Sequence, residues 1–577
     1  MWSDHTNGPT GAHRRQRDHI YRHDRRRGWQ CRTFSLVGCI PLLTFFVMLL
    51  AFKTSAHVAG LTALGAALLV AIFGFNMPAQ LAALSATQGA VYGLFPIVWI
   101  VVMALWFYQV TVLSGRFEDL RTIFDTIGGG DLRIQAMLIA FCFGGLLEAL
   151  AGFGAPVAIT ATMILALGLK PLKTATVVLI ANTAPVAFGA IAIPITTAGV
   201  LTGLDPAHIG AVVGHQAPFF AFVVPFFLLM IVDGVRGLKQ AWPAALAVGG
   251  TFAIAQWWCA THFSYELTDV VASLAGLAAA VILMRFWKPK GTEEVRADLG
   301  IDRPQSVEGL TPVRAWMAVL PYILVVVVFG IAKLWTWGIN IPQALAATDI
   351  KIPWPGLHGH LLNAAGEPIS GSVYNFQWLS SPGTLLLISG LLVAIIYSVF
   401  NHHGRFKLTV GNAIAEIGRS AWKMRFSALT IASVLALAYV MNFSGQTISI
   451  GTFVAGLGAA FAFFSPVLGW VGTAVTGSDT SANALFANLQ KTAALESGLD
   501  PYLMTAANTS GGVVGKMISP QSLAIAATAV SMQGQESKIF RSVIPWSIGM
   551  LIVLCAWCSC SPTCSLGCFP PHRLGDA

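Results

Sequence analysis

Charged residues are scarce in this chain. Asp, Glu, Lys and Arg make up 10% of its 577 residues, whereas soluble domains carry about 25%. Hydrophobic residues make up 55%, and the mean hydropathy is +0.70. This composition excludes a water-soluble globular protein. The net charge of +9 comes mainly from loops between hydrophobic runs, so it indicates membrane topology and no nucleic-acid partner.

The chain also lacks the patterns of several other classes. Its hydrophobic runs show no sustained alternation of apolar and polar residues, which argues against an outer-membrane β-barrel. Gly128-Gly129-Gly130-Asp131 resembles a Gly-x-Gly-Asp protease motif, but it lies in a charged loop, and the sequence has no Tyr-Asp partner. It also has no His-Glu-x-x-His metal motif. We therefore expect no enzyme and no catalytic residues.

Cysteine is unevenly distributed, and its pattern does not suit a metal site. Five of the nine cysteines crowd the C-terminus, at Cys555, Cys558, Cys560, Cys564 and Cys568. They lack two separated Cys-x-x-Cys pairs and accompanying histidines, and they adjoin a hydrophobic helix. We expect neither a bound metal nor a cofactor.

Long hydrophobic runs recur along nearly the whole chain. Examples are Trp99 to Leu113, Trp242 to Cys259, Leu267 to Met284 and Val319 to Leu334. Runs of this length suit helices that cross the hydrocarbon core of a bilayer. The sequence therefore predicts an all-α polytopic membrane protein with roughly 12 transmembrane helices plus re-entrant or broken helices.

Composition divides the chain into five segments. Eight arginines make the N-terminal segment basic, and we expect it to be a disordered extension. The segments are the extension (1–35), a first transmembrane half (36–287), a charged cytoplasmic linker (288–314), a second transmembrane half (315–545) and an atypical Cys-rich tail (546–577).

The two halves share a pattern of small and helix-breaking residues. Ala181-Asn182-Thr183, followed by Gly189 and Pro194, recurs as Ala507-Asn508-Thr509, Gly515 and Pro520. Gly144 and Gly152 likewise match Gly469 and Gly477. Many transporters consist of two such repeats, often inverted, with the substrate site at their interface. We therefore expect two structural repeats.

The repeated motifs combine helix breakers with small polar side chains. Gly and Pro free backbone groups that protein, water or ligand must satisfy inside a membrane. Helix N-termini at such breaks attract a carboxylate. We expect Asn182, Thr183, Asn508 and Thr509 to contact a substrate. The alternative is that these small residues only allow close helix packing.

Three ionisable residues fall within or beside these motifs, where a charge is costly unless paired or hydrated. Lys516 is expected to hold a substrate carboxylate, and Glu148 or Asp479 to carry a coupling proton. The remaining expected substrate contacts are Ser478, Thr480 and Gln521. Alternatively, Lys516 pairs with Asp479 or Glu148 and only locks the halves together.

The same motifs resemble those of the L-lactate permease family. The matching stretches run from Phe141 to Gly203 and from Phe463 to Ala526, including Gly-Lys-Met-Ile-Ser-Pro-Gln-Ser at 515–522. The resemblance implies a bacterial inner-membrane symporter that imports L-lactate, and glycolate or D-lactate, with protons. It also implies a fold of the ion-transporter superfamily, with inverted repeats. A sodium-coupled or exchange transporter of another small organic anion remains the alternative.

The sequence departs from the family at both ends. Residues 1 to about 35 are unusually basic, and a cysteine-rich segment follows Trp546, where the family has a long final helix. We expect this tail to be too short and polar to complete a membrane span.

Overall fold

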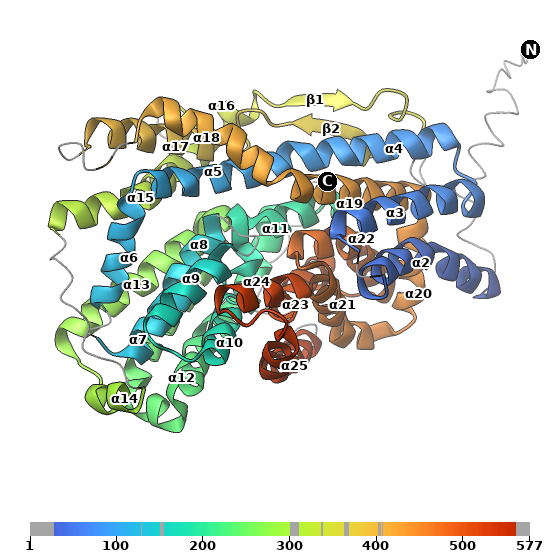
Figure 1. The fold of residues 1–577 in the computed structure, drawn as a ribbon. Coiled ribbons are helices and arrows are strands. Elements are labelled where there is room, and N and C mark those ends of the chain that lie inside the picture. The colour runs from blue at the N-terminus through green and yellow to red at the C-terminus, as the bar shows by residue number, and fades with distance from the viewer. Residues whose placement is uncertain are drawn as a thin grey trace, which may run out of the picture.

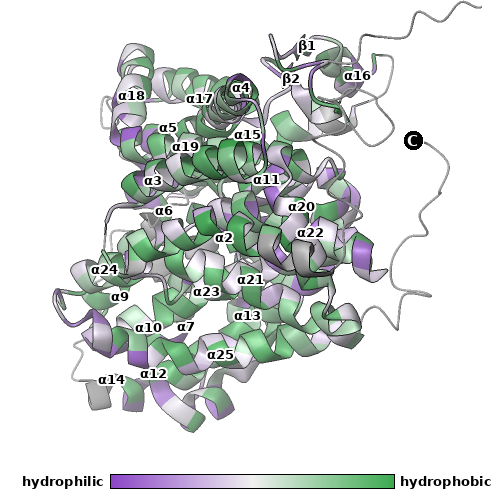
Figure 2. Cartoon of the chain, turned by 90° about the vertical axis from the view of Figure 1, so that its right-hand side faces the viewer, coloured by the Kyte–Doolittle hydropathy of each residue, from purple (hydrophilic) through white to green (hydrophobic). Residues whose placement is uncertain are grey.

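The computed structural model describes residues 28–52, 54–127, 130–150, 155–299, 311–335, 339–362, 369–401, 406 and 408–560. Nearly all of its ordered elements are helices. Within these residues, 10 helices are long and apolar enough to cross a membrane, or 11 if one bent pair counts as a span. The chain is an all-α polytopic membrane protein, as the sequence predicted. Figure 2 shows hydrophobic residues along most helices and hydrophilic ones mainly at helix ends and turns.

The first half contains a peripheral set and a central set of helices. The peripheral elements are α2 (Gly28–Leu50), α3 (Ala56–Leu69), η2 (Val70–Gly74), α4 (Ala79–Tyr92), η3 (Gly93–Val98), α5 (Trp99–Leu113) and α6 (Arg116–Ile127). The central elements are α7 (Leu132–Met137), η4 (Leu138–Phe143), α8 (Gly144–Leu150), α9 (Ala155–Ala166), α10 (Pro171–Ala181), η5 (Val186–Phe188), α11 (Gly189–Thr202), α12 (Pro206–Trp258), η6 (Cys259–Phe263), η7 (Tyr265–Leu267) and α13 (Thr268–Phe286), followed by α14 (Thr292–Leu299).

The second half has the same division. Its peripheral elements are α15 (Pro312–Leu334), α16 (Ile341–Ala346), β1 (Ile350–Pro353), η8 (Ser370–Ser372), β2 (Val373–Phe376), α17 (Pro382–Val399), α18 (Val410–Lys423), α19 (Arg425–Ser444) and α20 (Gln446–Ala455). Its central elements are η9 (Gly458–Ala460), α21 (Phe461–Thr476), α22 (Asp479–Ser497), α23 (Pro501–Lys516), α24 (Pro520–Ala529) and α25 (Glu536–Cys560).

Peripheral helices from both halves pack together on one side of the molecule. Figure 1 shows α4, α5, α17 and α18 along that side, with the β1–β2 hairpin outermost. Helix α4 packs against α19, and α5 packs against α17. The two strands are antiparallel, with Ile350 opposite Phe376. The central helices α7, α10, α12 and α25 lie on the opposite side (Figure 1).

Helix α12 consists of two antiparallel segments. Gly234 has φ +66° and ψ −152°, a backbone conformation that suits glycine and ends a helix. A Cβ at Gly214 would lie 2.6 Å from the Cβ of Ala260, and one at Gly249 would lie 2.8 Å from the Phe222 carbonyl oxygen. These approaches require the chain to fold back at Gly234. The hairpin adds one span to the count by length, which brings it toward the roughly 12 expected.

The order of the central elements repeats, and so do their contacts. Elements α8 to α12 correspond in sequence position to α21 to α25. Helix α9 packs on α24, and the corresponding pair α22 and α11 also pack together. Helix α10 packs on α25, and α23 packs on α12. Reciprocal contacts of this kind arise when two related units face each other across a pseudo-twofold axis.

The chain ends differ from the sequence prediction. Helix α25 continues to Cys560, so the expected end of the second half at residue 545 is wrong. Cys555 and Cys558 are buried in this helix, because cysteine behaves there as a small apolar side chain. The predicted tail therefore completes a span. Helix α2 begins at Gly28, inside the predicted extension, and residues 1–27 and 561–577 lie outside the described residues.

Glycines bring α21 and α23 into direct backbone contact. A Cβ at Gly469 would lie 1.8 Å from the Asn508 carbonyl oxygen, and one at Gly511 would lie 2.0 Å from the Pro466 carbonyl oxygen. No side chain fits at those positions without moving a helix. The glycines of the repeated motif therefore serve close packing in this half, as the alternative reading of the sequence proposed.

We predict that Gly469→Ala destabilises the protein, because the added methyl group overlaps the backbone of α23. The expected loss is more than about 2 kcal/mol, which is within the range for overpacking. Thermal unfolding in detergent measures it. Gly549→Ala in α25 is the control, since a Cβ there meets no atom within 4 Å. Equal melting temperatures for the two variants would contradict the packing argument.

Candidate functional site

A buried ion pair joins the two halves at the centre of the molecule. Lys516 Nζ, at the last residue of α23, donates to Glu148 Oε1 on α8. The exposed fraction is 8% for Lys516 and 2% for Glu148. Charges buried this deeply need a partner, so the pair explains how both side chains are tolerated. The second carboxylate oxygen, Glu148 Oε2, has no hydrogen-bond partner among the described residues.

The expected helix break occurs in the first half. Helix α10 ends at Ala181, Asn182 caps it, and the chain turns before α11. The two segments meet at an angle of 60°. Pro185 lies in the turn and has no backbone N–H to continue a helix. A Cβ at Gly189 would lie 3.0 Å from Glu148 Oε1, so glycine lets that carboxylate reach the break.

The residues after the break adopt a left-handed conformation. Ala190, Ile191 and Ala192 have φ values of +46°, +59° and +53°. This conformation costs roughly 1–2 kcal/mol for each L-residue. All three residues are buried, so the packing around the break must offset that cost.

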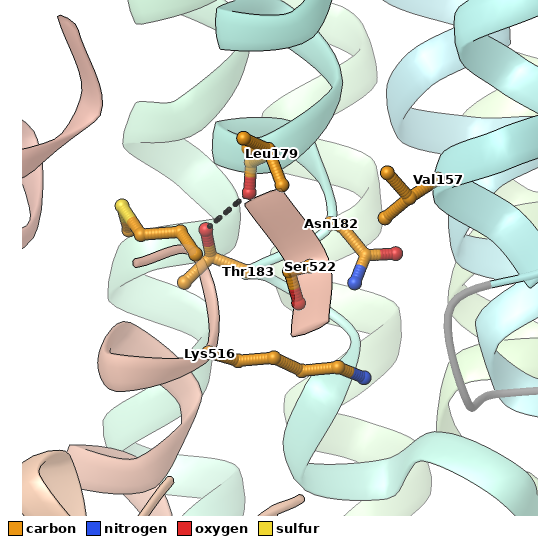
Figure 3. A pocket seen from close by; sticks show the side chains of 7 residues that line it. Val157, Leu179, Asn182, Thr183, Lys516 and Ser522 are labelled. Atoms are coloured by element: carbon orange, nitrogen blue, oxygen red, sulfur yellow. Dashed lines mark hydrogen bonds between the residues drawn. The ribbon is translucent and has the colours of Figure 1, made fainter. Parts of the chain in front are cut away.

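Asn182, Thr183 and Lys516 line a small pocket together with Val157, Leu179, Met517 and Ser522. Figure 3 shows the Lys516 amine and the Asn182 amide on the same side of this pocket. Asn182 Oδ1 is buried without a partner among the described residues. The Thr183 hydroxyl donates to the Ile180 carbonyl oxygen at 2.5 Å, so it is available to a ligand only as an acceptor. The structure thus places three of the predicted substrate contacts in one pocket, and Lys516 also pairs with the predicted proton carrier Glu148.

The pocket is narrow in this conformation. Its volume is about 170 Å³, including space that is open to the outside. A small organic anion enters only if the side chains or the two halves separate. The geometry is therefore that of a narrow site beside a charged pair.

Asp479 is a second buried carboxyl group near Lys516. It begins α22, is 4% exposed, and its Oδ1 accepts from Thr473 Oγ1 at 3.3 Å. A Cβ at Gly512 would lie 1.9 Å from this oxygen, so glycine leaves room for the carboxylate. The Lys516 charge acts on Asp479, although the two groups form no ion pair. One amine thus lies near two buried carboxyl groups.

Asn508 and Thr509 lie away from the pocket, in the middle of α23. Asn508 Nδ2 and Thr509 Oγ1 both donate to Asn483 Oδ1 on α22, at 2.9 and 3.1 Å. Asn508 Oδ1 accepts from Gln490 Nε2 at 3.1 Å. Both residues are fully buried. Their side chains connect α22 to α23, and α23 is continuous where its counterpart in the first half is broken.

The other predicted contacts lie near Asp479. Ser478 caps α22 and accepts from the Ser481 N–H at 3.3 Å. Thr480 is buried in the first turn of that helix. Gln521 is exposed, and its side chain lies against Gly477. None of these three lines the pocket with Lys516.

Two buried polar residues near the site were not identified from the sequence. Asp269 lies at the start of α13, and Gln256 near the end of α12 donates to it. In the sequence, Asp269 looks like an ordinary acidic residue in the first turn of a helix, where the helix dipole favours it. Its position within a long hydrophobic run was the available signal.

Comparison with known proteins places these features in a family. The family model for L-lactate permease matches residues 34–562, which is nearly the whole chain. The chain belongs to the L-lactate permease family. It is therefore a multi-pass bacterial membrane protein of the permease class.

Characterised relatives of this family member are similar over most of their length. The glycolate permease GlcA of Escherichia coli K12 is 40% identical over 539 residues, covering 89% of this chain and 93% of the relative. The L-lactate permease of Bacillus subtilis 168 is 41% identical over 552 residues, covering 90% and 94%. The L-lactate permease of E. coli K12 is 40% identical over 530 residues, covering 89% and 93%.

We predict that the Glu148–Lys516 pair of this permease family member contributes to stability as a unit. Glu148→Gln or Lys516→Gln alone should cost about 3–5 kcal/mol, because each leaves an uncompensated buried charge. The double variant should cost less than the sum, since it leaves neither charge. Thermal unfolding of all four proteins in detergent gives the coupling, and additive losses would show that the two groups act independently.

Proposed function

We propose that this protein imports L-lactate, together with glycolate or D-lactate, by symport with protons across the bacterial inner membrane. The observation that carries the proposal is the Glu148–Lys516 pair beside the Asn182 break. A buried amine next to unpartnered polar atoms suits a small hydroxycarboxylate. The names of the characterised relatives supply the substrate class.

Lys516 is the group proposed to bind the substrate carboxylate. Its ammonium group donates hydrogen bonds and carries the positive charge that an anion needs at membrane depth. The Asn182 amide offers a further polar contact from the opposite half. The Thr183 hydroxyl can accept a bond from the substrate hydroxyl, because its own proton is already donated to the backbone.

Glu148 is the group proposed to carry the coupled proton. When the substrate carboxylate forms an ion pair with Lys516, Glu148 loses its cationic partner. An unpaired carboxylate is strongly disfavoured in a low-dielectric interior, so Glu148 then takes up a proton. Anion and proton therefore enter together, and the charge of the site stays unchanged.

Asp479 is proposed as a second proton-carrying group. It lies within the field of Lys516, and its Oδ2 has no partner among the described residues. Ser478 and Thr480 place hydroxyls beside it. Asn508 and Thr509 are proposed to act through their bonds to Asn483, which hold α23 and hence Lys516 in position.

Uptake of labelled L-lactate in a permease-deficient bacterium tests the function. We expect saturable accumulation that an uncoupler abolishes and that does not require sodium. Competition with glycolate, D-lactate and pyruvate ranks the substrates. Accumulation that needs sodium and survives the uncoupler would overturn proton symport.

We predict that Lys516→Gln abolishes lactate uptake per molecule of protein in the membrane, so uptake is normalised to the amount of each variant that the membrane contains. Loss of a charge-assisted contact to the substrate carboxylate should reduce uptake by about 100-fold or more. Asp500→Asn is the matched control, because Asp500 is an exposed N-cap of the same helix and Asn caps equally well. Wild-type uptake by the Lys516 variant would exclude the proposed binding role.

We predict that Glu148→Gln and Asp479→Asn separate binding from coupling. Each amide keeps the size of the side chain but cannot exchange a proton. The variants should lose accumulation driven by a pH gradient and retain exchange of internal for external lactate. Counterflow in vesicles measures the exchange. A variant that loses exchange and accumulation together would instead have a binding or structural role.

A further inference from the structure

A further carboxyl group, Asp269, lies deep in the central helices and has no cationic partner. It is 0% exposed, and no residue of the described chain forms an ion pair with it. Its Oδ1 accepts from Gln256 Nε2 at 3.0 Å, and its Oδ2 has no hydrogen-bond partner within the described ranges. An unpaired carboxylate is costly here, so the group is stable as the neutral acid.

Gln256 connects Asp269 to the helix break. The same amide nitrogen that donates to Asp269 also donates to the Ala184 carbonyl oxygen at 3.2 Å. Ala184 follows Asn182 and Thr183, so this carbonyl is one of the groups freed by the break. The Gln256 side chain thus connects the protonation state of Asp269 to the backbone beside the substrate pocket.

Asp269 also faces Glu148. Helices α8 and α13 pack together, and a Cβ at Gly145 would lie 2.8 Å from Ser273 Oγ. Gly145 and Glu148 are three residues apart on α8, while Asp269 and Ser273 are four apart on α13, so each pair shares a helix face. The Glu148 charge acts on Asp269.

The other titratable groups around α13 provide no net positive charge to Asp269. Glu266 accepts from Ser264 at 2.7 Å, and α6 and α15 bring the Asp119–Arg314 pair, whose charges offset each other. Nearby titratable groups are the buried Cys142 and Cys259, the partly buried Tyr265 and the exposed His262. Arg285 lies 16 residues further along α13, and Asp233, Arg236 and Lys239 lie around the turn of the α12 hairpin, far from Gln256. Glu148 is therefore the charged group that acts on Asp269, which is otherwise governed by its burial and its bond from Gln256.

The contacts favour a proton over a metal cation at this position. Both oxygens that Gln256 contacts are acceptors, so its NH₂ group must face them. The Gln256 NH₂ group lies between Asp269 Oδ1 and the Ala184 carbonyl oxygen. A cation bound by these two oxygens would need the same position. A proton on Asp269 Oδ2 needs no such space.

We propose that Asp269 is the internal proton donor to Glu148. This inference rests on the proposed symport and deepens it. The transfer occurs when a substrate carboxylate replaces Glu148 as the ion-pair partner of Lys516. The O–H bond of Asp269 then breaks, and an O–H bond forms on Glu148 Oε2. Asp269 is left as a carboxylate, which strengthens its bond from Gln256, until a proton from the proton-rich side restores the acid.

Asp269→Asn tests the proposal, because Asn has the same size and still accepts from Gln256. We expect accumulation driven by a pH gradient to fall by about 100-fold, the usual scale for loss of a positioned proton donor. Exchange of lactate at equal pH should stay within about twofold of wild type, since no net proton transfer is needed. Asp205→Asn is the control, because Asp205 is an exposed N-cap of α12.

The conservative variant Asp269→Glu keeps the proposal testable if the Asn variant fails to reach the membrane. It should retain coupled uptake with a shifted pH profile, whereas a purely structural role would leave that profile unchanged. Wild-type accumulation by Asp269→Asn would overturn the donor role alone. Absence of uncoupler-sensitive uptake in the wild type would overturn the proposed symport itself.

Discussion

The structure depends on one buried ion pair. Glu148 and Lys516 come from different halves of the chain and meet where both are buried. Removing an ion from water costs several kcal/mol even in real protein interiors, so each group is tolerated mainly because the other is present. This requirement fixes the end of α23 against α8. It also brings the Lys516 amine to Asn182, at the only place in the described chain where a bent helix pair breaks a span.

The buried carboxyl groups outnumber the amine that they surround. Lys516 pairs with Glu148 and acts on Asp479, while Asp269 lies on α13, which packs against the helix that carries Glu148. Three ionised carboxylates around one ammonium would leave an excess of two negative charges in a medium that stabilises none. The proposed proton symport relieves this excess, because a protonated carboxyl group carries no charge. In that proposal a substrate anion adds a further negative charge, which favours protonation of a neighbouring carboxyl group.

The sequence predicted the membrane class, the two halves and the break at Asn182, because composition, Gly and Pro act locally. It did not distinguish this motif from its repeat at Asn508. Pro185 follows the first motif and cannot continue a helix, whereas Gly511 follows the second and only permits close packing. Asn508 is buried through its hydrogen bond to Asn483, which lies 25 residues away on another helix. Contacts of that kind depend on tertiary structure and leave no local signal.

The repeat is symmetric in its backbone and asymmetric in its charges. In the register set by the matched glycines and prolines, Lys516 corresponds to Ala190, and Glu148 corresponds to Thr473. The reciprocal packing of α9 on α24 and of α22 on α11 shows that the two repeats share one backbone arrangement. The amine is nevertheless present once. Two equivalent cations would create two anion sites and repel each other at the shared interface. A single cation opposed by a small residue instead makes one site, with the freed backbone of the half that lacks this cation next to it.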